Sequence, residues 1–380
     1  AHAGNRNTQH VKIELAEEMK LNPKWEKPKL VFAEIYLREG NISKAIDEIS
    51  AVLKDNPRNL SAHILMGDAY LMNRNMASAA KVFENLIKIA PNNPVGYSQM
   101  GKILLIQKKE QEALARFEKA LSLQPDYIDP LQSIISIHMN KQDVKKALAR
   151  MEQQIKLLPN NALLYHMRGT IHAANNDLAN AESNLKKAIE LDSKLPSLYI
   201  SLANFYMRQK MNEKAKSQYN SAIEKAPHAL SAYMALGMIY ESEKNFKKAQ
   251  EHYEKALKIN PNFPPAANNL AYLYMEQGGN IDVALNLAQK AKEQLPDDPH
   301  ISDTLGWIYY KKNIPSRAVA YLKEAAEKHP KQPLDRYHLG MAYYRSGNRA
   351  MAKNELQEAL KMEPGFPGAE EARATLKALK

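Results

Sequence analysis

Residues 94–127 read PVGYSQMGKILLIQKKEQEALARFEKALSLQPDY, and variants of this 34-residue segment recur along nearly the whole chain. The clearest marker of the recurrence is a proline that returns at the same place in successive copies. The series is Pro23, Pro57, Pro91, Pro125, Pro159, Pro227, Pro261, Pro296, Pro330 and Pro364, with Ser193 in the one empty place. A fixed period of this length is typical of a helix-turn-helix unit that stacks into a solenoid. The sequence therefore predicts an array whose function lies on its surfaces rather than in one pocket.

Length and composition agree with an all-α array. A chain of 380 residues would ordinarily be expected to form two or three globular domains, but here the period crosses every place where a boundary could fall. In an array each repeat packs only on its neighbours, so the usual size limit of one core does not apply. Glycine is infrequent, with 14 residues, and good helix formers fill the segments between the prolines.

The repeat has further constant positions when the third residue after each proline is counted as position 1. Position 24 is bulky in most repeats, and position 11 is often Tyr or His. Position 8 is small, with Gly67, Gly101, Gly169, Ala203, Gly237, Ala271, Gly306 and Gly340. Position 20 is alanine in all ten repeats, namely Ala45, Ala79, Ala113, Ala147, Ala181, Ala215, Ala249, Ala284, Ala318 and Ala352. This pattern resembles the tetratricopeptide repeat family.

The constant positions have a physical reading. We expect the small residues at positions 8 and 20 to lie where the two helices of one repeat cross most closely, with bulky residues at positions 11 and 24 beside them. The proline at position 32 lacks an amide hydrogen and restricts the residue before it, so it ends the second helix. In several repeats a further proline at position 1 suits the first turn of the next helix.

These boundaries predict ten repeats over residues 26–366, with one extra residue in the turn at 278–279. Residues 1–25 are expected to hold a leader and, from about Asn5 to Leu21, the lone second helix of a preceding repeat, which suggests that the natural protein extends upstream. Residues 367–380 are expected to form a capping helix, because terminal repeats expose one face to water. The family resemblance implies a right-handed superhelical α-solenoid.

The resemblance also implies an adaptor whose first helices line a concave groove, chiefly through positions 2, 5, 9 and 12 with part of 6 and 13. In the middle repeats these positions are mostly neutral and polar, and they turn amide and aromatic towards the C-terminus. Two readings of the aromatic residues stay open: contact with a partner, where Trp307 is the best single candidate, or packing between adjacent first helices. The candidate groove residues are Gln132, His166, Asn204, Asn268, Asn269, Tyr272, Trp307, Tyr310, Tyr337 and Tyr344.

Two better-defined groove chemistries of the family are not matched. The clamp that holds a C-terminal carboxylate needs a second asparagine where this chain has Ala235, after Asn204. The asparagine ladder of the sugar-transferase members needs asparagine at position 6 of successive repeats, and only Asn269 provides it among those compared.

The net charge of +11 and the pI near 9.3 raise the question of nucleic-acid binding. The basic excess is spread evenly, with 26 Lys and Arg against 21 Asp and Glu in residues 1–190 and 27 against 21 in the rest. Nucleic-acid binders usually gather basic residues into a patch, so no specific nucleic-acid binding is expected.

No cysteine, zinc spacing, glycine-rich phosphate loop or nucleophile motif is present, so we expect no enzyme activity, no cofactor and no metal site. His138 and His172 occupy position 11, and we expect them to fill the space between helices there in place of tyrosine.

The sequence thus favours a non-enzymatic scaffold that binds a protein or peptide ligand in the groove. Residues 268–272, 303–307 and 337–340 resemble phrases of bacterial tetratricopeptide proteins of envelope and exopolysaccharide-secretion assemblies, which suggests a bacterial origin. The absence of cysteine fits a periplasm or a cytoplasm, and no apolar run approaches the length of a membrane span. The alternative is a regulatory or substrate-docking arm of an enzyme whose catalytic domain lies elsewhere, and a third hypothesis is self-association through the terminal helices.

Overall fold

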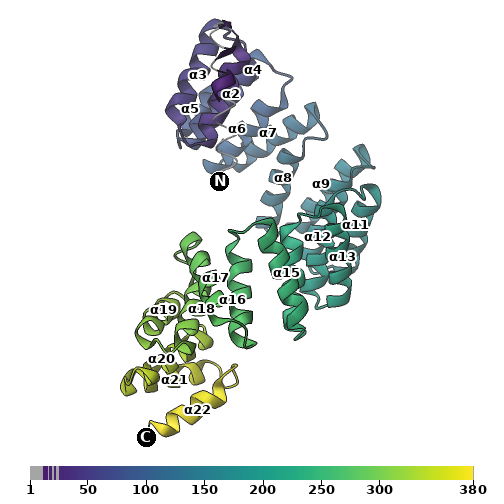
Figure 1. Cartoon of the computed structure of the whole chain (residues 1–380). Helices are drawn as coiled ribbons and strands as arrows, with labels where there is room; N and C mark the ends of the chain where they lie inside the picture. The colour runs from purple at the N-terminus through teal and green to yellow at the C-terminus, as the bar shows by residue number, and fades with distance from the viewer. Residues whose placement is uncertain (1–11, 16, 19–20, 23–24, 380) are drawn as a thin grey trace. The chain divides into compact units, whose positions relative to one another are not determined.

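The computed structural model describes residues 12–15, 17–18, 21–22 and 25–379, and in these residues all regular structure is helical (Figure 1). The prediction of an all-α repeat fold is confirmed. The first helices of the repeats are α2 (Glu26–Arg38), α4 (Leu60–Met72), α6 (Pro94–Ile106), α8 (Ile128–Asn140), α10 (Ala162–Ala174), α12 (Pro196–Arg208), α14 (Leu230–Ser242), α16 (Pro264–Glu276), α18 (Pro299–Lys311) and α20 (Pro333–Arg345). The second helices are α3 (Ile42–Asp55), α5 (Met76–Ile89), α7 (Glu110–Leu123), α9 (Val144–Leu157), α11 (Leu178–Leu191), α13 (Asn212–Lys225), α15 (Phe246–Ile259), α17 (Ile281–Gln294), α19 (Pro315–Lys328) and α21 (Arg349–Met362).

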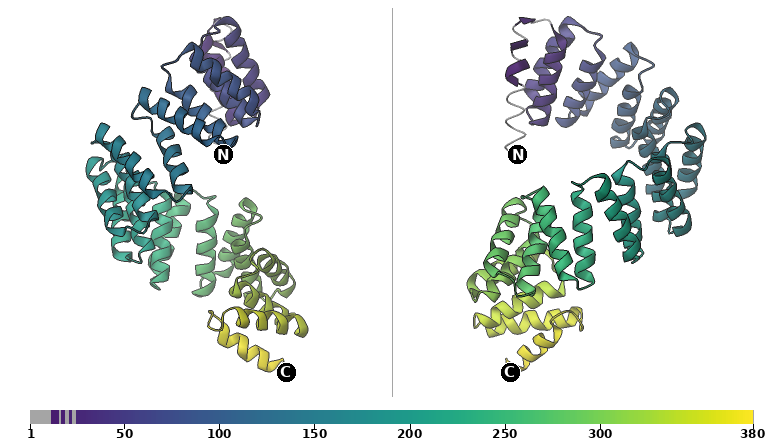
Figure 2. Two further views of the ribbon diagram at one scale, coloured as in Figure 1. Left: turned by 180° about the vertical axis from the view of Figure 1, so that it is seen from behind. Right: turned by 45° about the vertical axis from the view of Figure 1, so that its right-hand side comes forward.

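The chain divides into two compact bodies. The N-terminal body is Ala1–Leu191 and the C-terminal body is Asp192–Lys380, so the division falls beside Ser193, where the repeating proline is missing. Within each body the two helices of a repeat pack against each other, and each repeat packs on the next one in the chain (Figures 1 and 2). In the C-terminal body the first helices α16, α18 and α20 also lie side by side, followed by the terminal helix α22 (Ala369–Ala378).

The position-32 prolines follow the ends of the second helices. Each second helix ends two residues before position 32, as α5 does at Ile89 before Pro91. The turn between the two helices of a repeat follows another rule, because position 15 has a positive φ in all ten repeats. Only three of these residues are glycine; the full set is Gly40, Arg74, Lys108, Gln142, Asn176, Lys210, Lys244, Gly278, Asn313 and Gly347. The next amide then donates to the carbonyl of position 11, as Asn245 does to Tyr240 at 2.8 Å, which is the left-handed helix ending.

The two helices of a repeat cross where the sequence puts its small residues. The alanine at position 20 is fully buried in all ten repeats. The position-8 glycine leaves its space to the position-24 side chain, since a Cβ on Gly67 would lie 2.2 Å from Phe83, and one on Gly237 would lie 2.4 Å from Tyr253. In the repeats with glycine at position 8, close packing of the two helices therefore depends on the absence of a side chain there, because interiors leave no spare volume.

The extra residue of the eighth repeat is absorbed in its turn. Gly279 donates to the Tyr274 carbonyl at 2.7 Å, as position 16 does elsewhere, and Asn280 then caps α17 through its side chain. In other repeats one residue does both, as Asn75 does before α5. A Cβ on Gly279 would meet the Tyr274 ring at 2.7 Å, so a larger residue in this turn would have to displace that ring.

The described residues cover the N-terminal end of the array only in part and its C-terminal end up to residue 379. Most of the predicted leader over residues 1–25 lies outside the described residues, although residues 12–15, 17–18 and 21 are helical. Lys12 pairs with Glu39 at 2.7 Å. At the other end α22 caps the last repeat, and Tyr337 donates to Glu371 Oε2 at 2.7 Å. Gly368 precedes α22 with φ of 99°, and a Cβ there would strike the Tyr337 ring.

Candidate partner-binding groove

A groove of about 990 Å³ opens along the C-terminal body, and the first helices α14, α16, α18 and α20 supply most of its wall. We call it the C-terminal groove. It is lined chiefly by residues at positions 2, 5, 6, 9, 12 and 13 of their repeats, which are the positions predicted from the family resemblance. Among them are His300, Asp303, Asn269, Tyr272, Glu241 and Glu276.

Three of the ten predicted site residues line this groove: Asn268, Asn269 and Tyr272, all on α16. Asn269 Nδ2 donates to the Tyr253 hydroxyl at 3.4 Å. Asn268 Oδ1 is buried and has no hydrogen-bond partner among the described residues. Burial raises the pKa of the Tyr272 hydroxyl to about 12, with contributions from the charges of Glu276, Asp303 and Glu241. Three carboxylates of the same groove thus act electrostatically on the Tyr272 hydroxyl.

Trp307, Tyr310 and Tyr337 do not line the groove but pack behind it. The exposed fraction of the Trp307 side chain is only 6%, and its ring stacks on Tyr310 with centroids 4.3 Å apart and planes at 2°. The His338 ring also stacks on Trp307, with centroids 4.0 Å apart and planes at 20°. Tyr337 lies 5.9 Å from Trp307 in a tilted arrangement. We call Trp307, Tyr310, Tyr337 and His338 the aromatic layer; it joins α18 to α20, and its role in partner contact stays a prediction.

The aromatic layer is connected to the groove by polar contacts. His338 Nδ1 lies 2.8 Å from Asp303 Oδ1, and Asp303 lines the groove. Trp307 Nε1 donates to Glu276 Oε1 at 3.3 Å, and Glu276 lines the groove as well. The Arg345 guanidinium covers the Tyr310 ring at 3.8 Å and donates to the Tyr310 carbonyl. Two groove carboxylates are therefore held by the buried layer behind them.

Asp335 is the most unusual charged residue of the groove. Its exposed fraction is 4%, and Oδ2 has no hydrogen-bond partner among the described residues. His329 Nδ1 lies 3.4 Å from this oxygen, but it also lacks a hydrogen bond, so the two atoms are close without being aligned. Burial, with a smaller contribution from the charge of Asp303, raises the pKa of the Asp335 carboxyl to about 7. A buried carboxylate without a donor is costly, which makes Asp335 a candidate functional group.

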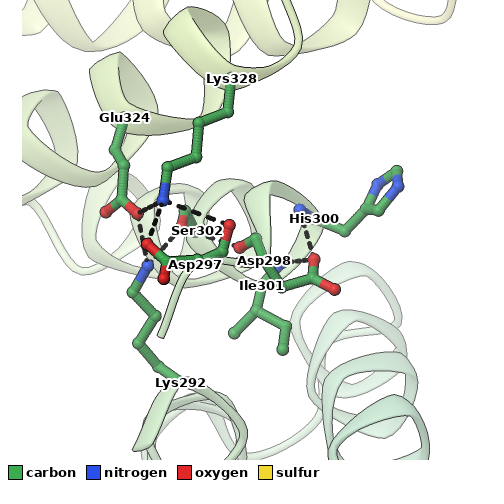
Figure 3. A network of polar contacts seen from close by, with 8 residues as sticks. All are labelled: Lys292, Asp297, Asp298, His300, Ile301, Ser302, Glu324 and Lys328. Atoms are coloured by element: carbon green, nitrogen blue, oxygen red, sulfur yellow. Dashed lines mark hydrogen bonds and ion pairs between the residues drawn. The ribbon is translucent and has the colours of Figure 1, made fainter. Parts of the chain in front are cut away.

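The start of α18, which carries His300 and Asp303, is braced from the side of the second helices (Figure 3). Asp298 caps the helix by accepting from the His300 and Ile301 amides at 2.9 and 3.3 Å. Lys292 donates to Ser302 Oγ at 2.6 Å and pairs with Glu324 at 2.8 Å. Figure 3 also shows Lys328 reaching Asp297 and Glu324, while the His300 side chain points away from both lysines. This network holds the α18 wall of the groove in place.

The remaining predicted residues lie elsewhere. Gln132 and His166 belong to the N-terminal body, where Gln132 lines a smaller hollow of about 470 Å³ with Asp129 and Ser133. Burial lowers the pKa of His166. In the C-terminal body Asn204 accepts from the Tyr219 hydroxyl at 2.6 Å, and Tyr344 is 40% exposed on α20. The structure thus gathers three candidates in the C-terminal groove and three more in the aromatic layer, and leaves four apart.

Sequence reasoning assigned no role to Asp303, Asp335 or His338, although these residues shape the groove. One signal was available for two of them, since Asp303 and His338 occupy neighbouring positions 5 and 6 of successive repeats. No group of three His, Asp or Glu side chains that could hold a metal ion occurs in the part of the chain that the structure describes. The same residues include no helix long and apolar enough to cross a membrane.

Comparison with protein families identifies the array. A tetratricopeptide repeat model described as the cilia and flagella-associated protein 70 C-terminal domain matches residues 112–379, and two further tetratricopeptide repeat models match residues 30–94 and 96–127. The chain belongs to the tetratricopeptide repeat family. Proteins of this family are generally scaffolds for protein interactions and typically non-catalytic.

Individual relatives of this tetratricopeptide repeat protein are distant. A TPR repeat-containing protein of Pseudomonas aeruginosa is 34% identical over 70 residues, which are 18% of this chain and 12% of the length of that relative. The solved Cut9–Hcn1 hetero-tetramer of the APC/C is similar with a TM-score of 0.50 at 12% identity, over 97% of this chain and 98% of that one. YrrB, described as a TPR protein with an unusual peptide-binding site, is 24% identical with a TM-score of 0.41, over 50% of this chain and 97% of that one.

Proposed function

We propose that this protein is a non-enzymatic scaffold that holds an extended segment of a protein partner in the C-terminal groove. The observation that carries the proposal is one continuous hollow of about 990 Å³ to which four successive first helices contribute. Its wall combines amides, hydroxyls and carboxylates with the ring of Tyr272. Side chains of this kind suit hydrogen bonds to a peptide backbone, and amphipathic rings are frequent at binding hot spots.

The dimensions suit a short extended segment. Neighbouring helices pack with axes about 8–10 Å apart, so a path from α14 to α20 crosses three such steps, or roughly 24–30 Å. An extended chain advances at most about 3.3–3.6 Å per residue, so about seven to nine residues would span the groove.

The groove also has a rigid wall, which favours binding. The aromatic layer and the braced start of α18 hold Glu276, Asp303 and His300 before any partner arrives. A site that is already ordered loses less conformational entropy on binding, so more of the contact energy appears as affinity.

Site-specific photo-crosslinking tests this proposal. A photoreactive residue in place of Tyr272 on α16 should trap a partner segment, and the same residue in place of Lys290, which is exposed on the second helix α17, serves as the control. The crosslink at position 272 should weaken when Asn268 and Asn269 are both replaced by alanine. Equal trapping at positions 272 and 290, or no effect of the double variant, would contradict binding in the groove.

Three finer hypotheses from the sequence remain proposals. Membership of a bacterial envelope or exopolysaccharide-secretion assembly rests on the resemblance of residues 268–272, 303–307 and 337–340, and cell fractionation of the native protein tests it. A docking arm of a larger enzyme predicts a catalytic domain in the same reading frame. Self-association through the terminal helices predicts a sedimentation coefficient that rises with concentration.

A further inference from the structure

We propose that the C-terminal groove recognises a lysine or arginine side chain of the bound segment at Asp335, so that the scaffold selects basic segments. This inference rests on the proposed function, because it names the chemistry of the segment that the groove would hold. It is carried by the position, burial and missing hydrogen bond of one carboxylate, together with the charge of the surrounding wall.

The first step is the state of Asp335 itself. The residue is 4% exposed and lines the groove, yet Oδ2 has no hydrogen-bond partner among the described residues. Among those residues no lysine or arginine forms an ion pair with it, and His329 Nδ1, which lies 3.4 Å from Oδ2, makes no hydrogen bond to it. Buried charges in proteins are ordinarily paired, so this carboxylate lacks the lysine or arginine partner that an incoming segment could supply.

The second step is that the other groove carboxylates already have donors. Glu241 Oε2 accepts from the Tyr253 hydroxyl at 2.6 Å, Glu276 accepts from Trp307, and Asp303 is paired with His338. The hydrogen bond from the neutral tyrosine leaves the Glu241 charge in place, whereas the Glu276 charge is partly offset by Lys311 at 3.9 Å. Lys244 is the one lysine or arginine among the lining residues, against the carboxylates of Glu241, Glu276, Asp303 and Asp335. The wall is therefore acidic although the chain as a whole carries +11.

The third step concerns hydrogen bonding along the wall. Asn268 Oδ1 on α16 is a second buried acceptor without a donor. The unpartnered acceptors at α16 and α20 favour a ligand that brings hydrogen-bond donors, because a buried acceptor without a hydrogen bond is costly. A segment with backbone amides at Asn268 and a cationic side chain at Asp335 meets both needs. Two helix spacings of about 8–10 Å separate these helices, so about five or six extended residues would connect the two contacts.

A peptide is favoured over a bare metal ion by the same geometry. In the part of the chain that the structure describes, no three His, Asp or Glu side chains converge as a metal site would need. Tyr272, which lines the groove together with Glu241, Glu276 and Asp303, adds a ring beside which the methylene stem of a lysine or the plane of a guanidinium can lie.

Blocked eight-residue peptide libraries test the inference. Each library has degenerate neutral flanks around one fixed central residue, which is Lys, Arg, Gln or Glu, and is passed over the immobilised full chain. Wild type should retain the Lys and Arg libraries about tenfold better than the Gln library. Asp335→Asn should lose this preference, while Asp47→Asn, which makes the same charge change at an exposed site in the other body, should keep it.

The outcomes separate this inference from the proposed function. Equal retention of all four libraries, with crosslinking at position 272, overturns the choice of a basic residue and leaves the groove as the binding site. An unchanged Lys and Arg preference in Asp335→Asn also overturns the assignment to Asp335. Retention of no library, or retention without crosslinking at position 272, overturns both. Circular dichroism of each variant confirms that loss of binding is not loss of fold.

Discussion

Replacing Asp335 by asparagine should stabilise the protein in a pH-dependent way. The folded-state pKa of Asp335 is about 7 against an ordinary value of 3.8, because the carboxyl is buried and lies near Asp303. A shift of about three units corresponds to about 4 kcal/mol between the two protonation states. The folded state holds the proton more tightly than the unfolded state, so stability falls as pH rises from about 4 to about 7 and is level above that.

Asparagine has nearly the same shape and no charge, so it removes this penalty. The advantage of Asp335→Asn over wild type should grow by about 3 kcal/mol between pH 5 and pH 8. His329 at 3.4 Å, with the His300 ring 4.5 Å from it, would offset part of the charge when protonated. The His338 and Asp303 pair lies beside the same groove. The full effect is therefore expected at the higher pH, where the Asp335 carboxyl is ionised.

Urea unfolding followed by circular dichroism at pH 5 and pH 8 measures the effect, with Asp47→Asn as the matched control. Repeat arrays can unfold in parts, so hydrogen exchange of α20 peptides should accompany the global measurement. A variant that is no more stable than wild type at pH 8, or whose advantage is the same at both pH values, would refute the reasoning. Such a result would mean that Asp335 is compensated in the free protein, and the case for a cationic partner would weaken with it.

Further predictions concern packing. Trp307→Ala should lower the free energy of unfolding by about 3–5 kcal/mol because it leaves a cavity in the aromatic layer. The control Trp25→Ala, at a side chain that is 43% exposed, should lower it by well under half of that. Similar urea midpoints for the two variants would contradict the packing of Trp307. Gly237→Ala should cost about 1–3 kcal/mol because its Cβ would meet Tyr253 at 2.4 Å. Gly365→Ala, with nothing within 4 Å, is the control; equal melting temperatures would count against close crossing. Gly347→Ala, at φ of 83°, should cost about 1 kcal/mol in thermal unfolding.

The groove was only partly predictable from the sequence. Asn268, Asn269 and Tyr272 occupy first-helix positions that face a groove in this family, and they line the C-terminal groove. Trp307, Tyr310 and Tyr337 occupy positions of the same set but are buried. Position in the repeat does not separate the two groups, because Tyr272 and Trp307 both occupy position 9, yet Tyr272 lines the groove and Trp307 stacks on Tyr310 and His338.

The conformation of the turn residues was likewise only partly predictable from the sequence. Position 15 adopts the left-handed conformation in every repeat, yet only Gly40, Gly278 and Gly347 signal it, since seven other repeats place a different residue there. Packing of the two helices over-determines the turn, so the chain tolerates a conformation that most residues disfavour.

By itself the sequence determined the array: its period, the start and end of its helices and the alanines at its crossings. These follow from local causes, namely helix propensity, the missing amide of proline and the small volume of glycine and alanine, which act within one repeat. The tertiary structure alone decided which polar residues matter. Asp335 is unusual because residues of neighbouring elements bury it and place Asp303 near it, and Asp303 is held by His338, 35 residues away along the chain. Burial and charge depend on neighbours across repeats, and a period read along one chain does not contain that information.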